Sequence, residues 1–181
     1  MTANTITIRD ATPQDIPAVL PMVQSICDMH AAMDPDRYSF VPDITSRYAT
    51  WLPKRIADAG SVILVAESQL QTSNPTPAPH IVAFLIAETL DEIPIYLTKR
   101  YGFIHDLWVQ PAYRRQGIAQ TLTRECLARF AAMNLTQVRL DTAAANDSAH
   151  ALFANMGFSA STTQMLHTLS CHLHHSPSLA T

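Results

Sequence analysis

The chain lacks paired cysteines, long apolar runs and an excess of positive charge. Its three cysteines, Cys27, Cys126 and Cys171, are odd in number, lie far apart and form no Cys-x-x-Cys. This excludes a disulfide framework and predicts reduced thiols in a cytoplasmic protein. Two of the three fall on the apolar face of a predicted helix, which disfavours a catalytic cysteine.

No segment reaches the roughly 18 consecutive apolar residues of a membrane helix. Residues Met1 to Asp10 lack the basic start and apolar core of a signal peptide. A net charge of −3 and a pI near 6.2 argue against nucleic acid or an anionic membrane as the main partner. A Walker-type nucleotide loop is excluded because no Gly-x-x-x-x-Gly-Lys-Ser/Thr occurs.

A length of 181 residues with 48% hydrophobic content predicts one compact domain over residues 1–170, followed by a frayed tail at 171–181. Apolar periodicity and turn residues predict alternating strands and helices along it. Strands are expected at 6–8, 62–66, 81–87, 103–109 and 138–141, with a final strand pair at 158–169. Helices are expected at 12–33, 44–58, from 116 or 117 onward, and between 146 and Gly157. This order predicts a mixed α/β fold with helices on both faces of the sheet.

The most informative segment is Val109 to Ala119, which joins an apolar strand to an amphipathic helix. Pro111 cannot donate to a sheet ladder, so the strand should end there. The first N–H groups of the helix have no intrahelical partner and lie at the positive end of its dipole, which makes them an anion site. Gly117 lets a phosphate approach the main chain, while Arg114 and Arg115 supply charge. The segment predicts a diphosphate-binding loop.

Two motifs in order carry a resemblance to a known family. Arg114, Gly117 and Ala119 meet the pattern Gln/Arg-x-x-Gly-x-Gly/Ala, and residues 146–158 match Asn-x-x-Ala-x-x-Leu-Tyr-x-x-x-Gly-Phe except at Phe153. The chain thus resembles the GNAT superfamily of acyl-CoA-dependent N-acetyltransferases over about residues 5 to 170. The resemblance implies a largely antiparallel sheet of six to seven strands that splays between the fourth and fifth.

The resemblance also implies acetyl-CoA as co-substrate, with its pyrophosphate on the turn and its pantetheine along the open strand edge. We expect the main chain of Leu107, Trp108 and Val109 to contact pantetheine and thioester, and an N–H there to stabilise an oxyanion. Asn146 either bonds the pantetheine or caps the following helix. The residues expected at the pyrophosphate are Arg114, Arg115, Gln116, Gly117, Ile118, Ala119 and Gln120.

An acceptor amine must lose a proton before it attacks the thioester, so a base or a water path to one is needed. His105 and Asp106 are the candidates for catalysis, with Glu88 nearby; the family often has an acidic residue here, which favours Asp106. His105 and Asp106 point to opposite faces of a regular strand unless a bulge intervenes. Phe153 replaces the tyrosine that protonates the leaving thiolate in many relatives, and water, Ser148, His150 or another tyrosine could substitute for it.

The acceptor is predicted less sharply than the donor. Four aspartates between Asp28 and Asp43, together with Glu88, Asp91, Glu92 and Asp106, either form an acidic funnel for a cationic amine or are ordinary solvated residues. The histidines at 167, 172, 174 and 175 lack a complete ligand set, so no metal is predicted. Edge strands could pair in a homodimer. The alternative to an enzyme is a non-catalytic acyl-CoA sensor.

Overall fold

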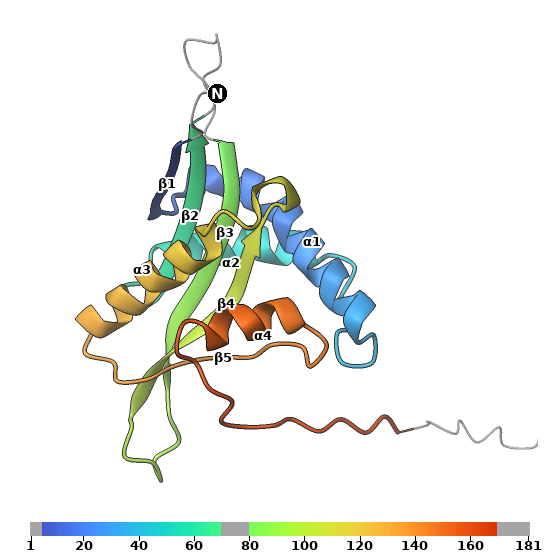
Figure 1. Ribbon diagram of the computed structural model, residues 1–181, viewed down its shortest axis with the longest axis vertical. Coiled ribbons are helices and arrows are strands. Elements are labelled where there is room, and N and C mark those ends of the chain that lie inside the picture. Colours follow the sequence, from blue (N-terminus) through green and yellow to red (C-terminus); the bar gives the residue numbers. More distant parts are fainter. Residues whose placement is uncertain (1–4, 70–79, 170–181) are drawn as a thin grey trace, which may run out of the picture.

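The computed structural model describes residues 5–69 and 80–169. Their centre is a five-stranded sheet in the order β1-β2-β3-β4-β5 (Figure 1). The first four strands are antiparallel, and β5 lies parallel to β4. The strands are β1 (Thr5–Asp10), β2 (Ser61–Gln69), β3 (His80–Asp91), β4 (Arg100–Val109) and β5 (Val138–Leu140).

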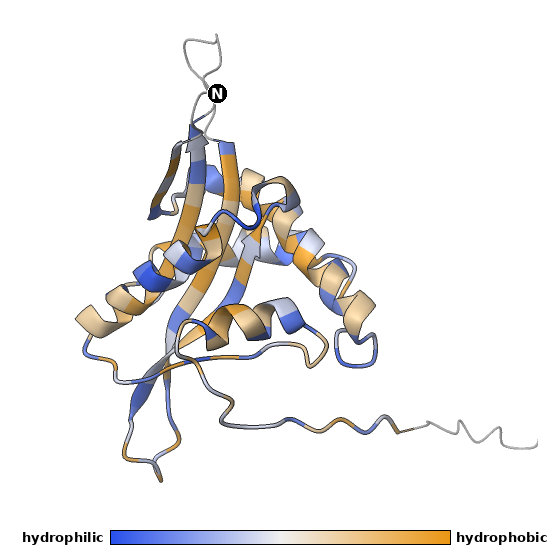
Figure 2. Ribbon diagram, viewed as in Figure 1, coloured by the Kyte–Doolittle hydropathy of each residue, from blue (hydrophilic) through white to orange (hydrophobic). Residues whose placement is uncertain are grey.

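Helices cover both faces of this sheet, as the order of the elements predicts. The core on one face contains α1 (Ile16–Met33) and α2 (Ile44–Ile56), whereas the other face is covered by α3 (Ile118–Ala132). The short helix α4 (Asp147–Ala154) follows β5 and lies on the same side of the sheet as α3 (Figure 1). The middle runs of β2 and β3 are continuously apolar, as expected for strands buried on both faces (Figure 2).

Local sequence signals explain where several elements begin and end. Thr12 and Asp15 form a reciprocal capping box around a short 3-10 turn, Pro13–Asp15, that leads into α1. Pro111 lies directly beyond β4 and opens a second 3-10 turn, Pro111–Tyr113, before α3. Gly157 adopts φ +90° after α4, the left-handed conformation expected of a helix-ending glycine.

The predicted final strand pair at 158–169 is wrong, and the sheet therefore has five strands instead of six to seven. This segment is an extended coil whose side chains are largely exposed. Its Ser/Thr-rich start offers no alternating apolar face to bury. Gln164 accepts a hydrogen bond from Arg37, and Thr168 donates one to Asp36, so the coil contacts the α1–α2 loop. The predicted loop at 71–79, Cys171 and the tail at 171–181 lie outside the described residues.

A partly buried ion pair joins β1 to the start of α1. Arg9 makes two hydrogen bonds to the carboxylate of Asp15, at 2.7 and 2.8 Å, and a third to Glu67. Burial alone would raise the pKa of Asp15, but hydrogen bonds from Arg9 and Thr12 outweigh it and the pKa is lowered. The carboxylate therefore stays charged and ties β1 and β2 to the start of α1.

Replacement of Gly102 by alanine should destabilise the fold markedly. A Cβ at this position in β4 would overlap the fully buried ring of Phe130 in α3. We expect a loss of about 1–3 kcal/mol in the free energy of unfolding, measured by urea denaturation. Gly60→Ala is the matched control, because its Cβ would meet Asp58 at an ordinary 3.5 Å. Equal stability of the two variants would contradict the close approach of α3 to β4.

Strands β4 and β5 stay together for only three residue pairs. Gly102, Phe103 and Ile104 lie opposite Val138, Arg139 and Leu140, and β5 ends there. Among the described residues, the remainder of β4 pairs only with β3. The separation between the fourth and fifth strands is therefore present where the family resemblance implies it, and it leaves one edge of β4 unpaired.

Candidate active site

The start of α3 has the main-chain geometry of an anion site. Gly117 is the N-cap residue with φ +78°, and no side chain caps the helix. The first intrahelical bond runs from the Thr121 N–H to the Gly117 carbonyl, so the preceding N–H groups lie before the helical ladder. No atom lies within 4 Å of the position that a Cβ on Gly117 would take. The N-terminal end of α3 is therefore accessible to a ligand.

The two arginines of this loop are placed differently. Arg114 donates a hydrogen bond from Nε to the Val109 carbonyl at 3.0 Å, and its guanidinium lies 4.7 Å from the centre of the Trp108 ring. Arg114 therefore stabilises the end of β4 through Nε, and its Nη groups remain available to bind an anion. Arg115 is exposed and has φ 64°. Left-handed residues at 115 and 117 are typical of loops that form anion-binding concavities.

A bulge in β4 changes which groups face its open edge. Ile86 lies opposite Asp106 but Ala87 lies opposite Ile104, so His105 is the extra residue. Before the bulge, Gly102 N–H bonds to Gln137 on the β5 side; after it, Gln110 N–H bonds to Val82 on the β3 side.

The N–H and C=O groups of successive residues in a strand point to opposite edges. The direction of these groups near the expected thioester position therefore follows from their direction at Gln110. The groups of Trp108 point toward Phe84 in β3, whereas those of Leu107 and Val109 point to the open edge. We therefore narrow the expected pantetheine contacts to the main chain of Leu107 and Val109. Trp108 contributes its side chain to the core beneath α1 and α2.

The same bulge places both His105 and Asp106 on the α2 side of the sheet. Tyr48 of α2 donates a hydrogen bond to Asp106 at 2.9 Å, and the Trp51 ring lies 6.4 Å from the His105 ring in an edge-on arrangement. In a regular strand only one of the two residues could face α2. Both candidate bases therefore lie on one face.

His105 is held by a charged network. Its Nε2 lies 2.8 Å from Oε1 of Glu88, whose other oxygen accepts from Arg55 at 2.5 Å. Arg55 also lies 3.3 Å from Asp58. The Glu88 side chain is only 17% exposed, while that of His105 is 30% exposed. Glu88 can therefore orient the ring while the ring still meets solvent.

Asp106 sits in a less accessible environment than His105. Burial raises the pKa of Asp106, and the hydrogen bond from Tyr48 and the charge of His105 only partly oppose this. Burial, together with the charge of Asp106, also raises the pKa of Tyr48. A phenol so disfavoured from ionising is a poor proton donor. Tyr48 therefore fits the role of a hydrogen-bond donor to Asp106 better than that of an acid.

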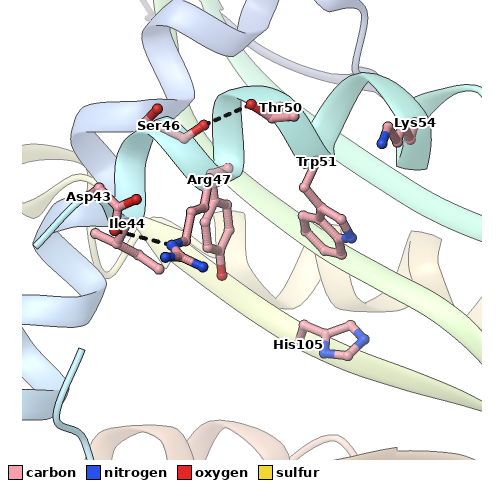
Figure 3. A pocket seen from close by; sticks show the side chains of 9 residues that line it. Asp43, Ile44, Ser46, Arg47, Thr50, Trp51, Lys54 and His105 are labelled. Carbon is pink, nitrogen blue, oxygen red and sulfur yellow. Dashed lines mark hydrogen bonds and ion pairs between the residues drawn. The ribbon is translucent and has the colours of Figure 1, made fainter. Parts of the chain in front are cut away.

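An open groove of about 700 Å³ lies between α2 and His105 (Figure 3). Residues from successive turns of α2 form one wall, and Trp51 points from that wall toward His105. We call this the acceptor groove. Its lining residues are Asp43, Ile44, Ser46, Arg47, Tyr48, Thr50, Trp51, Lys54 and His105.

The acidic funnel considered from the sequence is not formed by the described residues. Glu88 is held by Arg55 and His105, and Asp106 accepts from Tyr48. Glu92 pairs with Arg139 and Asp91 with Arg100, away from the acceptor groove. Asp43 alone among these acids lines the groove, and it pairs with Arg47. Of the acids counted from the sequence, the groove lining therefore contains only one, and that one is paired.

Asn146 acts as the N-cap of α4. Its Oδ1 accepts hydrogen bonds from the Ala149 N–H at 3.1 Å and from the Ser148 hydroxyl at 2.9 Å. The capping alternative is thus confirmed, and only the amide nitrogen is left to donate to a pantetheine group. His150 shares its Nε2 between Thr142 and the Ala143 carbonyl. Phe153 is buried against Phe158 and has no proton to give.

The two described cysteines are buried and free. Burial raises the pKa of Cys27 to about 11 and that of Cys126 to about 12. Such thiols stay protonated near neutral pH and are poor nucleophiles. The structure therefore gives them packing roles, which agrees with their place on the apolar faces of α1 and α3.

Comparison with known proteins decides the family. The model of the acetyltransferase (GNAT) family matches residues 25–158, which include both motifs, the bulge and α2. The chain belongs to the GNAT family. Human N-acetyltransferase 8 is 34% identical over 116 residues, which cover 64% of this chain and 43% of that protein. The chain therefore spans less than half the length of this relative.

Solved structures show the same GNAT fold. A mutant of the BH1408 protein from Bacillus halodurans has a TM-score of 0.76 at 19% identity, covering 91% of this chain and 99% of its own. A predicted acetyltransferase from Clostridium acetobutylicum, solved with acetyl-CoA, has a TM-score of 0.67 at 20% identity. The match covers 95% of this chain and 100% of that protein's chain. An aminoglycoside 6'-N-acetyltransferase from Acinetobacter haemolyticus has a TM-score of 0.66 at 20% identity. The match covers 91% of this chain and 98% of that protein's chain.

Some residues of the candidate site were not found from the sequence. Trp51, Lys54 and Arg55 carry no motif, and only their helical spacing from Tyr48 could have placed them near the same strand.

No helix among residues 5–69 and 80–169 is long and apolar enough to cross a bilayer.

Proposed function

We propose that the protein transfers an acetyl group from acetyl-CoA to a primary amine by direct attack. The observation that carries this proposal is the uncapped, open start of α3 next to an unpaired edge of β4. The first site suits a pyrophosphate, and the second suits the amides of a pantetheine arm. Membership of the GNAT family and a neighbour solved with acetyl-CoA support the same donor.

The proposed placement of the donor uses the residues expected from the sequence. The pyrophosphate lies on the N–H groups from Gln116 to Gln120, with Arg114 and Arg115 supplying charge. The pantetheine runs along the main chain of Leu107 and Val109, and the amide nitrogen of Asn146 reaches it from α4. An N–H of this rigid edge then stabilises the oxyanion of the tetrahedral intermediate.

We assign the base to His105 instead of Asp106, because His105 lines the acceptor groove and is more exposed. The amine enters through this groove, gives a proton to the imidazole directly or through water, and forms a C–N bond with the thioester carbon. Collapse of the intermediate breaks the C–S bond and releases the CoA thiolate. A thiol with a pKa near 8.5 leaves acceptably even though Phe153 gives no proton.

Thiol release from acetyl-CoA in the presence of an amine panel tests this function. The proposal expects release that depends on a particular amine and yields the matching acetamide by mass spectrometry. Tight CoA binding with no amine-dependent release across the panel would instead support a non-catalytic acyl-CoA sensor.

Pairing of two copies at an edge strand stays a separate proposal, which light scattering of the purified protein tests.

A further inference from the structure

The acceptor groove carries one positive charge without a partner. Of its ionisable lining residues, Asp43 and Arg47 pair with each other at 3.1 Å, one helical turn apart. Lys54 makes no hydrogen bond or ion pair with any described residue, and its side chain is exposed. The groove therefore attracts negative charge at one end, which is unsuited to a polycation.

The position of this charge relative to the base is set by α2. Arg47, Trp51 and Lys54 are spaced by four and three residues, so they share one face of the helix. Arg47 and Lys54 lie on either side of Trp51 along the helix, and Trp51 points toward His105 (Figure 3). Lys54 is about 4.5 Å beyond Trp51 along the helix axis, given a rise of about 1.5 Å per residue. Lys54 thus lies roughly one helical turn from Trp51, the residue of α2 that faces the proposed base.

The centre of the groove is aromatic. The rings of Trp51 and Tyr48 pack edge to face at 5.5 Å, and His105 contacts Trp51 and Phe103. Trp51 and Tyr48 are only partly buried, so their ring surface is available to a ligand. Flat aromatic surface of this kind favours an apolar or aromatic group over a strongly hydrated one.

We propose that the acceptor is a primary amine that also carries a carboxylate and an apolar or aromatic body. Its carboxylate meets Lys54, its body lies on Trp51, and its amine reaches His105. This inference rests on the proposed function and names the substrate class of that same site. It separates the protein from acetyltransferases whose acceptors are polycations.

The test compares amines that differ in one group, with acetyl-CoA as donor. L-Phenylalanine carries the carboxylate, phenethylamine lacks it, and spermidine is a polycation. We expect kcat/KM for phenylalanine to exceed that for phenethylamine by about 5-fold or more, after correction for the fraction of neutral amine. Lys54→Gln should narrow this ratio toward one, mainly through a higher KM for phenylalanine.

Arg124→Gln is the matched control, because it removes one exposed positive charge from α3 on the other face of the sheet. It should leave the ratio unchanged. A preference for spermidine or phenethylamine, or an equal effect of Lys54→Gln on both aromatic amines, would overturn the inference while leaving acetyl transfer intact.

Calorimetric titration of CoA-saturated protein with phenylalanine gives a readout that needs no turnover. Binding that weakens about 5-fold or more in Lys54→Gln, and not in Arg124→Gln, supports the inference. Binding that is equal in all three proteins, or absent in the wild type, contradicts it. Failure of every amine to release thiol would instead count against the proposed function.

Discussion

Replacing Gly117 by glutamate is expected to abolish measurable binding of acetyl-CoA. Gly117 has φ +78° at the N-cap of α3, and its Cβ position is open. A glutamate there would place a carboxylate where the pyrophosphate must lie, and like charges exclude each other. We expect affinity, measured by isothermal titration calorimetry, to fall by at least about 100-fold, equivalent to about 2.7 kcal/mol.

Gly157→Glu controls for backbone strain and net charge. Gly157 also has a left-handed φ, +90°, and an open Cβ position, but it lies at the end of α4. Both variants gain one negative charge and the same kind of backbone strain, of about 1–2 kcal/mol. Only Gly117→Glu should lose CoA. Similar affinities for the two variants would contradict the placement of the pyrophosphate.

Replacement of His105 by glutamine is expected to lower kcat for the preferred amine by about 100-fold or more at pH 7. Glutamine keeps a hydrogen-bonding group opposite Glu88 but cannot accept the proton of the amine. The loss should shrink at pH 9, because more of the amine is then already neutral. Steady-state kinetics across this range, with CoA affinity measured in parallel, provide the check.

Asp106→Asn is the paired variant that separates the two candidate bases. The amide can still accept the hydrogen bond from Tyr48, so the contact between α2 and β4 is retained. We expect less than about a 10-fold loss in kcat, with no change in its pH dependence. A larger, pH-dependent loss in Asp106→Asn than in His105→Gln would make Asp106 the base and show that the assignment to His105 is wrong.

The order of the elements could be predicted because it depends on local patterns. Apolar spacing marks α3, and Pro111 marks the end of β4, whatever the rest of the chain does. The proposed donor site rests on the same kind of local signal, since it consists of main-chain groups at one helix start. Gly117 adopts the left-handed conformation that such a turn requires.

Features that depend on pairing between distant residues could not be predicted in this way. The bulge at His105 arises from the register of β4 against β3, and it decides which side chains reach α2. Arg55, which bonds Glu88, and Tyr48, which bonds Asp106, come from α2, far away in the sequence. Charge counts along the chain therefore suggested an acidic acceptor side, whereas the folded site pairs Glu88 with Arg55 and His105, and Asp106 with Tyr48.

The most direct test of the central claim is a crystal structure of the protein with acetyl-CoA. The account predicts pyrophosphate oxygens within hydrogen-bonding distance of the N–H groups between Gln116 and Gln120. It also predicts pantetheine along Leu107 and Val109, with the thioester facing His105. Acetyl-CoA bound elsewhere, or an α3 start closed by the protein's own side chains, would contradict it.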